Sequence, residues 1–426
     1  MNNQPKETNS MRNVLSIRDF RFLFAGISTS LLGDQFTLIA TPWLVLQLTG
    51  DPVALGTVLA LEGVPRALFM LFGGAITDRF SPRVIMLVAD IVRFVLVGMM
   101  TAVTFAGMIQ LWMVYAFSLG FGLVAGFAVP AGNSIVPMIV KEKDLQAGNS
   151  LVMGVGQLVG FIGPVVAGIL IGNFTESLFG IGLAFGIDGI TFAISALTLG
   201  LMRQGGRLSS AAKTQEQETV WAAILAGLRY LWQDEALRLM FLVIAAINFL
   251  FVGPILVGIP VLADQWLAEG AVAFGMLMSG FAGGNLGGFV LAGVLPRPSG
   301  KMIRRLLIAL LVTFGIVLGL MGLFHSTWVD FALMGLLGLG NGYVTIILFT
   351  SMQSRTPKTM LGRIMSLLTL SSIGLVPVSQ ALSGVIITLN LPLLFVLAGG
   401  LMVLVAFWTA LQPALGTFSE TLLAEA

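Results

Sequence analysis

Ionisable side chains inside long apolar stretches are the residues of this sequence that could do chemistry. The stretch VLALEGVPRALFMLFGG, residues 58–74, carries Glu62 and Arg66 four residues apart. Side chains at this spacing reach each other on one face of a helix, and glutamate before arginine is the favourable order. A charge at the centre of a membrane helix costs at least about 2.5–3.5 kcal/mol, so such groups should be few and partnered.

Further charges occupy comparable apolar stretches, all in the first half of the chain. They are Asp34, Asp90, Arg93 and Asp188. One interpretation is a neutralised network that braces helices. The other is proton coupling, because a dry site favours the neutral form of a carboxyl group and a nearby guanidinium favours its ionised form. A motion that changes either influence would make the group bind a proton on one side and release it on the other.

The composition explains why these charges stand out. Of the 426 residues, 57% are hydrophobic and 10% are charged, and the mean hydropathy is +0.98. About a quarter of the residues of a soluble protein are charged, so the outer surface of this chain is expected to face lipid. A net charge of +2 gives no argument for nucleic acid. The absence of cysteine and the single histidine, His325, leave no expected metal site or disulfide.

Apolar stretches of spanning length, about 20 residues, recur along the whole chain. Backbone groups in lipid must be satisfied within the segment, so we expect helices. No cleaved signal peptide is expected at the polar, basic N-terminus. The twelve predicted spans are 20–47, 53–77, 84–106, 110–138, 146–172, 176–201, 237–261, 271–294, 303–324, 328–352, 362–388 and 391–411.

The distribution of basic residues predicts the orientation. All 22 lysines and arginines except Arg66 and Arg93 fall at the N-terminus or in alternate loops, and the opposite loops carry only acidic charges. By the positive-inside rule both termini are cytoplasmic. The one long polar connection, 203–236, separates a six-helix half at 1–202 from another at 237–426. Such duplication is typical of secondary transporters.

The break after the second span, GGAITDRFSPRVIM, resembles the cytoplasmic loop signature of the major facilitator superfamily. The residues that match are Gly74, Asp78, Arg79 and Arg83. Ser81 and Pro82 stand where glycine and a basic residue are usual. The resemblance implies that this loop latches the two halves on the cytoplasmic side.

Two further stretches resemble the drug and siderophore exporters of this superfamily, the branch that includes the enterobactin exporter and macrolide efflux proteins. The fifth span, GVGQLVGFIGPVVAG, is similar to an exporter signature. Its matching residues are Gly160, Gly163, Pro164 and Gly168. The segment SMQSRTPKTMLGRIMSL is similar to the loop before the eleventh span of that branch. The implied fold is an all-α integral membrane protein, with twelve transmembrane helices in two pseudo-symmetric bundles of six.

The resemblance also implies roles for the polar residues. The first helix lines the cavity in that fold, so Asp34 becomes the main candidate for proton coupling, together with Glu62 and Arg66. Helices 3 and 6 are peripheral, which favours a bracing network of Asp90, Arg93 and Asp188. The expected substrate contacts are Gln35, Tyr115, Asn248 and Asn341. Such amides could equally form interhelical hydrogen bonds, which contribute only about 0.6 kcal/mol on average.

The expected function is proton-coupled efflux of amphiphilic small molecules, such as drugs or siderophores, by a multi-pass monomer in the bacterial inner membrane. The proton gradient is the expected energy source, with no cofactor. A lysophospholipid flippase or a nutrient permease of the same fold is the alternative, because fold does not decide cargo or direction. Enzymatic activity is not expected. The glycine-rich run GFAGGNLGG, residues 280–288, lies inside an apolar span, where close helix packing explains it better than a nucleotide site.

Overall fold

A computed structural model describes residues 10–77, 80–174, 178–203, 228–295, 300–321, 323–355 and 374–412, with Leu367 and Ser371. Within these residues every regular element is a helix. In the N-terminal part they are α1 (Ser10–Ser16), α2 (Arg18–Thr49), α3 (Pro52–Thr77), α4 (Pro82–Phe105), α5 (Leu111–Ile139), η1 (Glu142–Asp144), α6 (Leu145–Gly172) and α7 (Phe179–Leu201). In the C-terminal part they are α9 (Glu235–Ile247), η3 (Asn248–Val252), α10 (Gly253–Gln265), α11 (Ala271–Val294), α12 (Gly300–Met321), α13 (Thr327–Arg355), α15 (Val376–Leu389) and α16 (Leu391–Leu411).

The helices confirm the predicted all-α membrane fold. In the described part of the chain, 11 helical segments are long and apolar enough to cross a membrane, and Val376–Leu389 is a shorter apolar helix. The bounds of α11 and α16 coincide with the predicted spans. The predicted span 362–388 lies partly outside the described residues. The short helix α1 was not predicted; its Ser10 hydroxyl donates a hydrogen bond to Asp144 at 2.9 Å.

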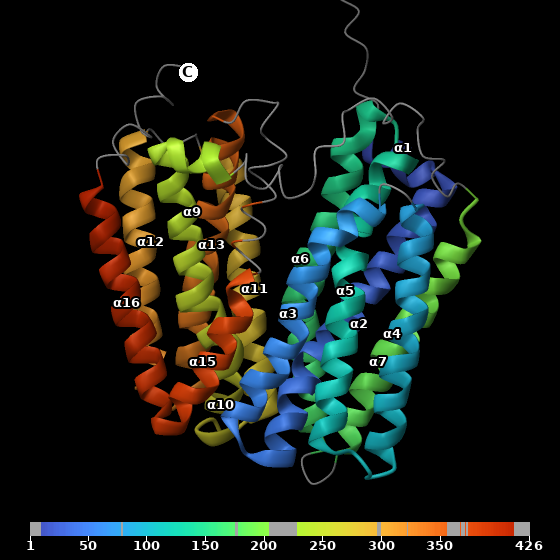
Figure 1. Cartoon of the computed structure of the whole chain (residues 1–426), viewed down its shortest axis with the longest axis horizontal. Coiled ribbons are helices and arrows are strands. Elements are labelled where there is room, and N and C mark those ends of the chain that lie inside the picture. Colours follow the sequence, from blue (N-terminus) through green and yellow to red (C-terminus); the bar gives the residue numbers. More distant parts are fainter. Residues whose placement is uncertain are drawn as a thin grey trace, which may run out of the picture. The chain divides into compact units, whose positions relative to one another are not determined.

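The chain forms two compact units. The first consists of Met1–Leu44 and Val64–Thr214, and the second of Val45–Gly63 and Gln215–Ala426. Both α2 and α3 therefore contribute residues to each unit. The domain boundaries expected at 202 and 237 stay predictions. Within each unit the long helices run side by side (Figure 1).

In the first unit, α4 packs closely along both α7 and α5. The guanidinium group of Arg83, in the first turn of α4, forms hydrogen bonds with the C-terminal end of α7. Its Nε donates to the carbonyl oxygen of Leu199 at 2.7 Å, and its Nη2 donates to that of Gly200 at 2.8 Å. The last carbonyl groups of a helix have no partner within the helix and carry partial negative charge, so an arginine stabilises them.

The second unit repeats this arrangement with different residues. Here α12 packs along α16, and Nη2 of Arg304, near the start of α12, donates to the carbonyl oxygen of Ala410 at 3.0 Å. An arginine of one helix thus caps the end of another in both units. The internal duplication into two six-helix halves stays a prediction.

The closest helix pair of the second unit is α11 with α13. A Cβ on Gly284 or Gly288 of α11 would collide with backbone atoms of α13 at Gly335 and Leu339. Only glycine permits this approach, as in other membrane helix pairs with small residues at the contact. Both glycines belong to the run GFAGGNLGG, so the packing interpretation of that run is confirmed.

A break in helical regularity lies in the first long helix of the second unit. Residues Asn248–Val252 form one turn of π-helix, η3, followed by Pro254, which has no N–H to donate. The hydroxyl group of Ser379 on α15 donates a hydrogen bond to the carbonyl oxygen of Phe249. A neighbouring helix thus supplies a donor at the position where the helical ladder is disturbed.

Candidate functional site

The candidate site is a polar cluster inside the first unit, and its most buried member is Asp188. This residue lies on α7 and is 0% exposed. The hydroxyl group of Thr37 on α2 donates a hydrogen bond to Oδ2 of Asp188. Thr191, one turn further along α7, lies 3.4 Å from Oδ1 and bonds the backbone carbonyl of Asp188 at 2.8 Å. A carboxyl group in the apolar bundle thereby obtains the hydrogen bonds that burial requires.

Two glycines allow α2 to approach α7 closely enough for this contact. A Cβ on Gly33 would collide with the side chains of Thr191 and Asp188, and a Cβ on Gly26 would collide with that of Thr198. The two glycines are seven residues apart, so they lie on the same face of α2. That face is therefore shaped to receive the polar side of α7.

Asp90 on α4 is the second buried carboxyl group, with 6% of its surface exposed. The hydroxyl group of Ser195 on α7 donates a hydrogen bond to its Oδ2 at 2.6 Å. Since Ser195 is seven residues beyond Asp188, one face of α7 serves both carboxyl groups.

The guanidinium group of Arg93 is the cation of the cluster. Its Cζ lies 5.1 Å from the ring centre of Phe121 on α5 and 5.4 Å from that of Phe192 on α7, within the range of cation–π attraction. Its buried Nε has no hydrogen-bond partner among the described residues. Arg93 interacts electrostatically with both Asp90 and Asp188. One guanidinium group thus lies against two aromatic rings and interacts electrostatically with two carboxyl groups.

Asp34 on α2 belongs to the same neighbourhood. Its charge acts on both Asp90 and Asp188. The structure therefore brings Asp34 together with Asp90, Arg93 and Asp188, whereas the sequence analysis grouped Asp34 with the charges of the second span. Asp34 itself is half-buried.

Glu62 and Arg66 lie one turn apart on α3, and both are half-buried. The division between the two units falls between them, after Gly63. Glu62 belongs to the second unit and Arg66 to the first. Their role in proton coupling stays a prediction.

The residues of the two sequence signatures have different surroundings. Asp78 and Arg79 lie outside the described residues, and Gly74 lies within α3. Arg83 caps α7 within its own unit, and the latch between halves stays a prediction. On α6, Gly163, Pro164 and Gly168 are buried and Gly160 is half-buried. A Cβ on Gly163 would overlap the side chain of Gln35.

The predicted substrate contacts are distributed over both units. Gln35 packs on Gly163, as described, and Tyr115 on α5 is half-buried. Asn341 on α13 is also half-buried. The amide group of Asn248, at the start of η3, donates to the carbonyl oxygen of Ile244 at 2.9 Å. This bond is made within its own helix rather than between helices.

Three hydroxyl residues of the cluster, Thr37, Thr191 and Ser195, were not among the predicted site residues. A signal for two of them was present, since residues 188, 191 and 195 follow the i, i+3, i+7 spacing of one helix face. Thr37 likewise follows Asp34 by three residues, but its bond to Asp188 could not be predicted because the two residues are 151 positions apart. Among the described residues, no group of three or more His, Cys, Asp or Glu side chains could hold a metal ion.

Comparison with known proteins identifies the family. Residues 23–378 match the family model of the Major Facilitator Superfamily. The chain belongs to this superfamily. It is 24% identical over 369 residues to the multidrug efflux pump Tap of Mycolicibacterium fortuitum, covering 85% of this chain and 86% of Tap. It is also 24% identical over 371 residues to the enterobactin exporter EntS of Shigella boydii serotype 18, covering 86% of this chain and 84% of EntS.

Solved structures of the superfamily share the fold. A mutant of the nucleoside transporter NupG has a TM-score of 0.71 at 10% sequence identity, with 92% of this chain and 98% of that chain covered. Likeness at this identity concerns the fold alone. The protein is therefore a multi-pass membrane transporter of the Major Facilitator Superfamily, with efflux proteins among its relatives.

Proposed function

We propose that the protein exports amphiphilic small molecules, such as drugs or siderophores, in exchange for protons. In this proposal it works by alternating access in the cytoplasmic membrane of a bacterium, with both termini in the cytoplasm. The names of its relatives, a multidrug efflux pump and an enterobactin exporter, support outward transport. The observation that carries the proton part is the burial of two carboxyl groups, Asp90 and Asp188, which accept hydrogen bonds from hydroxyl groups of neighbouring helices inside one bundle.

The charge balance of this group favours proton binding. Asp90 and Asp188 are both buried in spanning helices, and one guanidinium group can neutralise only one of them. Asp34 adds a third acidic side chain to the same neighbourhood. An uncompensated carboxylate in an apolar interior is costly, and such a group takes up a proton instead. We therefore propose that the coupled proton binds in this cluster of the first unit.

The position of α2 provides a way to link this proton to transport. The helix belongs to the first unit up to Leu44 and to the second from Val45. A rearrangement of the units during alternating access therefore acts on the helix that carries Asp34 and Thr37. Moving Thr37 away from Asp188 removes one of the hydrogen bonds that this carboxyl group accepts. Proton affinity then differs between the two states of the cycle.

The substrate class follows from the polar side chains that are available. Gln35, Tyr115, Asn248 and Asn341 are neutral, and the predicted spans of the second half carry no charge away from their ends. Neutral hydrogen-bonding groups among apolar side chains suit an amphiphilic or aromatic molecule. They do not provide the clamp of positive charges that a sugar phosphate or dicarboxylate needs.

Everted membrane vesicles with an imposed pH gradient test the proposal. Dyes, macrolides and a catecholate siderophore are offered in turn, and uptake and substrate-triggered proton release are recorded. We expect Asp34→Asn, Asp188→Asn and Glu62→Gln to lose gradient-driven transport but to keep gradient-independent substrate exchange. Glu142→Gln, which removes an exposed carboxylate of the same unit, is the matched control and should stay active. Unimpaired gradient-driven transport by the three single variants and by Asp34→Asn/Glu62→Gln would refute this coupling mechanism.

A further inference from the structure

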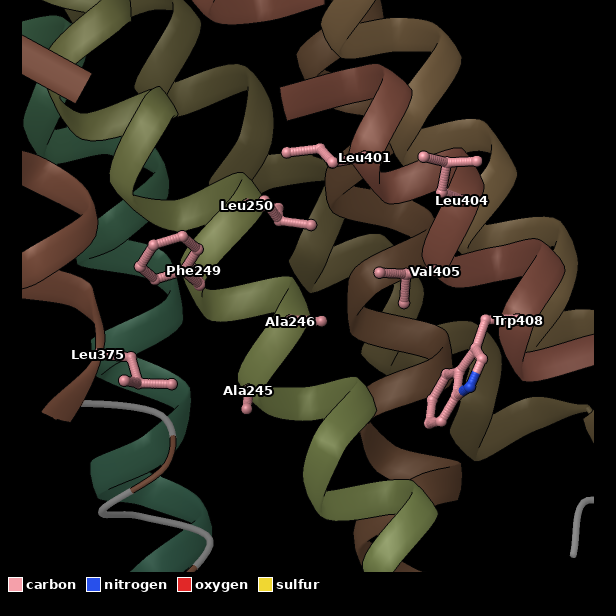
Figure 2. A pocket seen from close by; sticks show the side chains of 9 residues that line it. All are labelled: Ala245, Ala246, Phe249, Leu250, Leu375, Leu401, Leu404, Val405 and Trp408. Carbon is pink, nitrogen blue, oxygen red and sulfur yellow. The ribbon is translucent and has the colours of Figure 1, made fainter. Parts of the chain in front are cut away.

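A groove of about 490 Å³ lies in the second unit, between the α9–η3 segment and α16 (Figure 2). We call it the α9–α16 groove. Its nine lining residues are all apolar in character, and the indole nitrogen of Trp408 is the one side-chain polar atom among them. A cavity of this size can hold a small organic molecule or part of a larger one.

One wall of the groove is a continuous stripe on α16. Leu401, Leu404, Val405 and Trp408 follow the i, i+3, i+4, i+7 spacing of a single helix face. Leu404 is 62% exposed, Leu401 47% and Trp408 40%. Because α16 is a spanning helix, this exposed stripe faces acyl chains rather than water.

The opposite wall is made hollow by small side chains. Ala245 and Ala246 on α9 are adjacent and small, and Phe249 and Leu250 follow one turn later in η3. Figure 2 shows Ala246 facing the space that Val405 and Trp408 border from α16. A lipid-facing surface that is concave rather than flat offers more contact to a chain that lies along it.

Arginines and a tryptophan mark one end of the groove. Arg238 precedes Ala245 by seven residues and Ala246 by eight, so it lies on the same face of α9, two turns away. Arg304 bonds the carbonyl oxygen of Ala410, two residues beyond Trp408. Among the described residues, each of these two guanidinium groups donates one hydrogen bond to a backbone carbonyl, and its other N–H groups can bind a phosphate.

The acidic residues at this end do not neutralise all of the positive charge of the arginines. Asp234 caps α9, accepting hydrogen bonds from the N–H groups of Ala236 and Leu237, and Glu235 is exposed beside it. Arg305 follows Arg304 on α12, also exposed. Together with Trp408, these arginines have the composition of a membrane interface, where aromatic and basic side chains meet lipid headgroups.

The distance along the helix from Arg238 to Phe249, which lines the groove, matches the thickness of one leaflet. Eleven residues separate Arg238 from Phe249, which is about 16 Å at the rise of a helix. Half of the hydrocarbon thickness of a bilayer is about 15 Å. The arginines therefore lie at headgroup depth when Phe249 lies near the bilayer centre. In the orientation proposed above, this is the cytoplasmic leaflet.

We propose that the α9–α16 groove binds an anionic phospholipid of the cytoplasmic leaflet. One acyl chain lies along Ala246 and Val405, and the phosphate group binds Arg238 and Arg304. A transported amphiphile would need polar groups to orient it, and the groove offers the single indole N–H at its rim. A phospholipid matches the groove, because its apolar acyl chain lies inside and its charged headgroup lies at the basic end.

Native mass spectrometry of the purified full chain tests this site, with phosphatidylglycerol and phosphatidylcholine of identical chains as probes. We expect Ala246→Trp, which fills the groove, to lose the tightest-bound phosphatidylglycerol. The matched control is Phe407→Trp, which adds bulk to an exposed position of α16 outside the groove. Arg304→Gln should reduce the preference for phosphatidylglycerol over phosphatidylcholine roughly fivefold, as expected for one basic residue near a membrane surface. The exposed Arg12→Gln, in the first unit, should leave it unchanged.

A second measurement locates the acyl chain of the bound lipid. In nanodiscs, phosphatidylglycerol with brominated acyl chains should quench the fluorescence of Trp408, which is identified as the part of the signal that Trp408→Phe removes. Ala246→Trp should weaken this quenching of Trp408. Equal lipid retention by Ala246→Trp and Phe407→Trp would overturn the proposal. So would displacement of the lipid by a transported dye, which would make the groove part of the substrate path. Neither measurement depends on proton coupling, so this result and the transport result can fail separately.

Discussion

The hydroxyl group of Thr37 on α2 donates a hydrogen bond to the carboxyl group of Asp188 on α7, 151 residues further along the chain. This contact joins the helix that extends into both units to the helix that carries the most buried carboxyl group of the cluster. It is possible because Gly33, one turn before Thr37, brings the two helices together. The proposed coupling depends on this contact.

Replacing Thr37 by valine should weaken the cluster. Valine has nearly the same shape but no hydroxyl group, so Asp188 loses a hydrogen bond inside the bundle. A hydrogen bond to a charged group contributes roughly 1.5–3 kcal/mol. We expect a lower thermal unfolding temperature in detergent and a shifted pH dependence of transport. Thr29→Val, whose hydroxyl group bonds only carbonyl groups of its own helix, is the control and should change neither.

Replacing Gly33 by valine should separate α2 from α7. The added side chain would collide with Thr191 and Asp188, and overpacking of this kind costs about 1–3 kcal/mol. Gly98→Val on α4 adds the same side chain where nothing lies within 4 Å of the new Cβ. Unfolding temperature and transport should fall for Gly33→Val and remain near wild type for Gly98→Val. Equal effects of the two changes would show that Gly33 has no special packing role.

Composition and charge spacing were sufficient to predict the membrane fold. Continuous apolar runs leave the backbone no structure but a helix, and the ends of α11 and α16 fall where the polar residues begin. The π-helical turn at Asn248–Val252 was not predicted, although Pro254, which has no N–H to donate, lies two residues beyond it in the sequence. The loop signature likewise does not show that Arg83 caps α7.

The composition of the candidate site could be predicted only in part. Every charged member of the cluster is conspicuous in an apolar sequence, so each was identified. Their grouping was harder, because spacing reports only neighbours on one helix. Glu62 and Arg66 are such neighbours, whereas the proximity of Asp34 to Asp188 depends on how α2 packs on α7. That packing is set by Gly26 and Gly33, which look ordinary among the 52 glycines of the chain.

Removing the charge of Arg93 should destabilise the cluster, because its acidic side chains then lack their cation. Arg93→Gln removes the cation that interacts electrostatically with Asp90 and Asp188, and an uncompensated carboxylate in an apolar interior is costly. We expect a large loss of folded protein after extraction. Adding Asp90→Asn to Arg93→Gln should restore much of it, because one carboxylate fewer then needs a partner. If the double variant is as unstable as the single one, the interaction of Arg93 with the aromatic rings matters more than its charge.

Arg83→Gln tests the cap on α7. Its guanidinium group bonds the carbonyl oxygens of Leu199 and Gly200, so its loss should let the last turn of α7 open more often. Hydrogen exchange at the backbone amides of residues 199–203 should accelerate, while the middle of α7 stays protected. A latch between halves without a capping role predicts altered transport and unchanged exchange at this helix end. The measurement therefore separates the observed contact from the role implied by the loop signature.

Ser379 tests the support of the π-helical turn. In Ser379→Ala the carbonyl oxygen of Phe249 loses its donor from α15, and an unsatisfied buried group of this kind costs about 1–3 kcal/mol. The unfolding temperature should therefore fall. Thr388→Ala on the same helix removes a hydroxyl group that bonds only its own helix, at Val385, and should have little effect. Because Asn248 begins the turn, Ser379→Ala should also change the apparent affinity for a transported dye if this amide contacts substrate. Lower stability with unchanged affinity would assign the π-helical turn to packing alone.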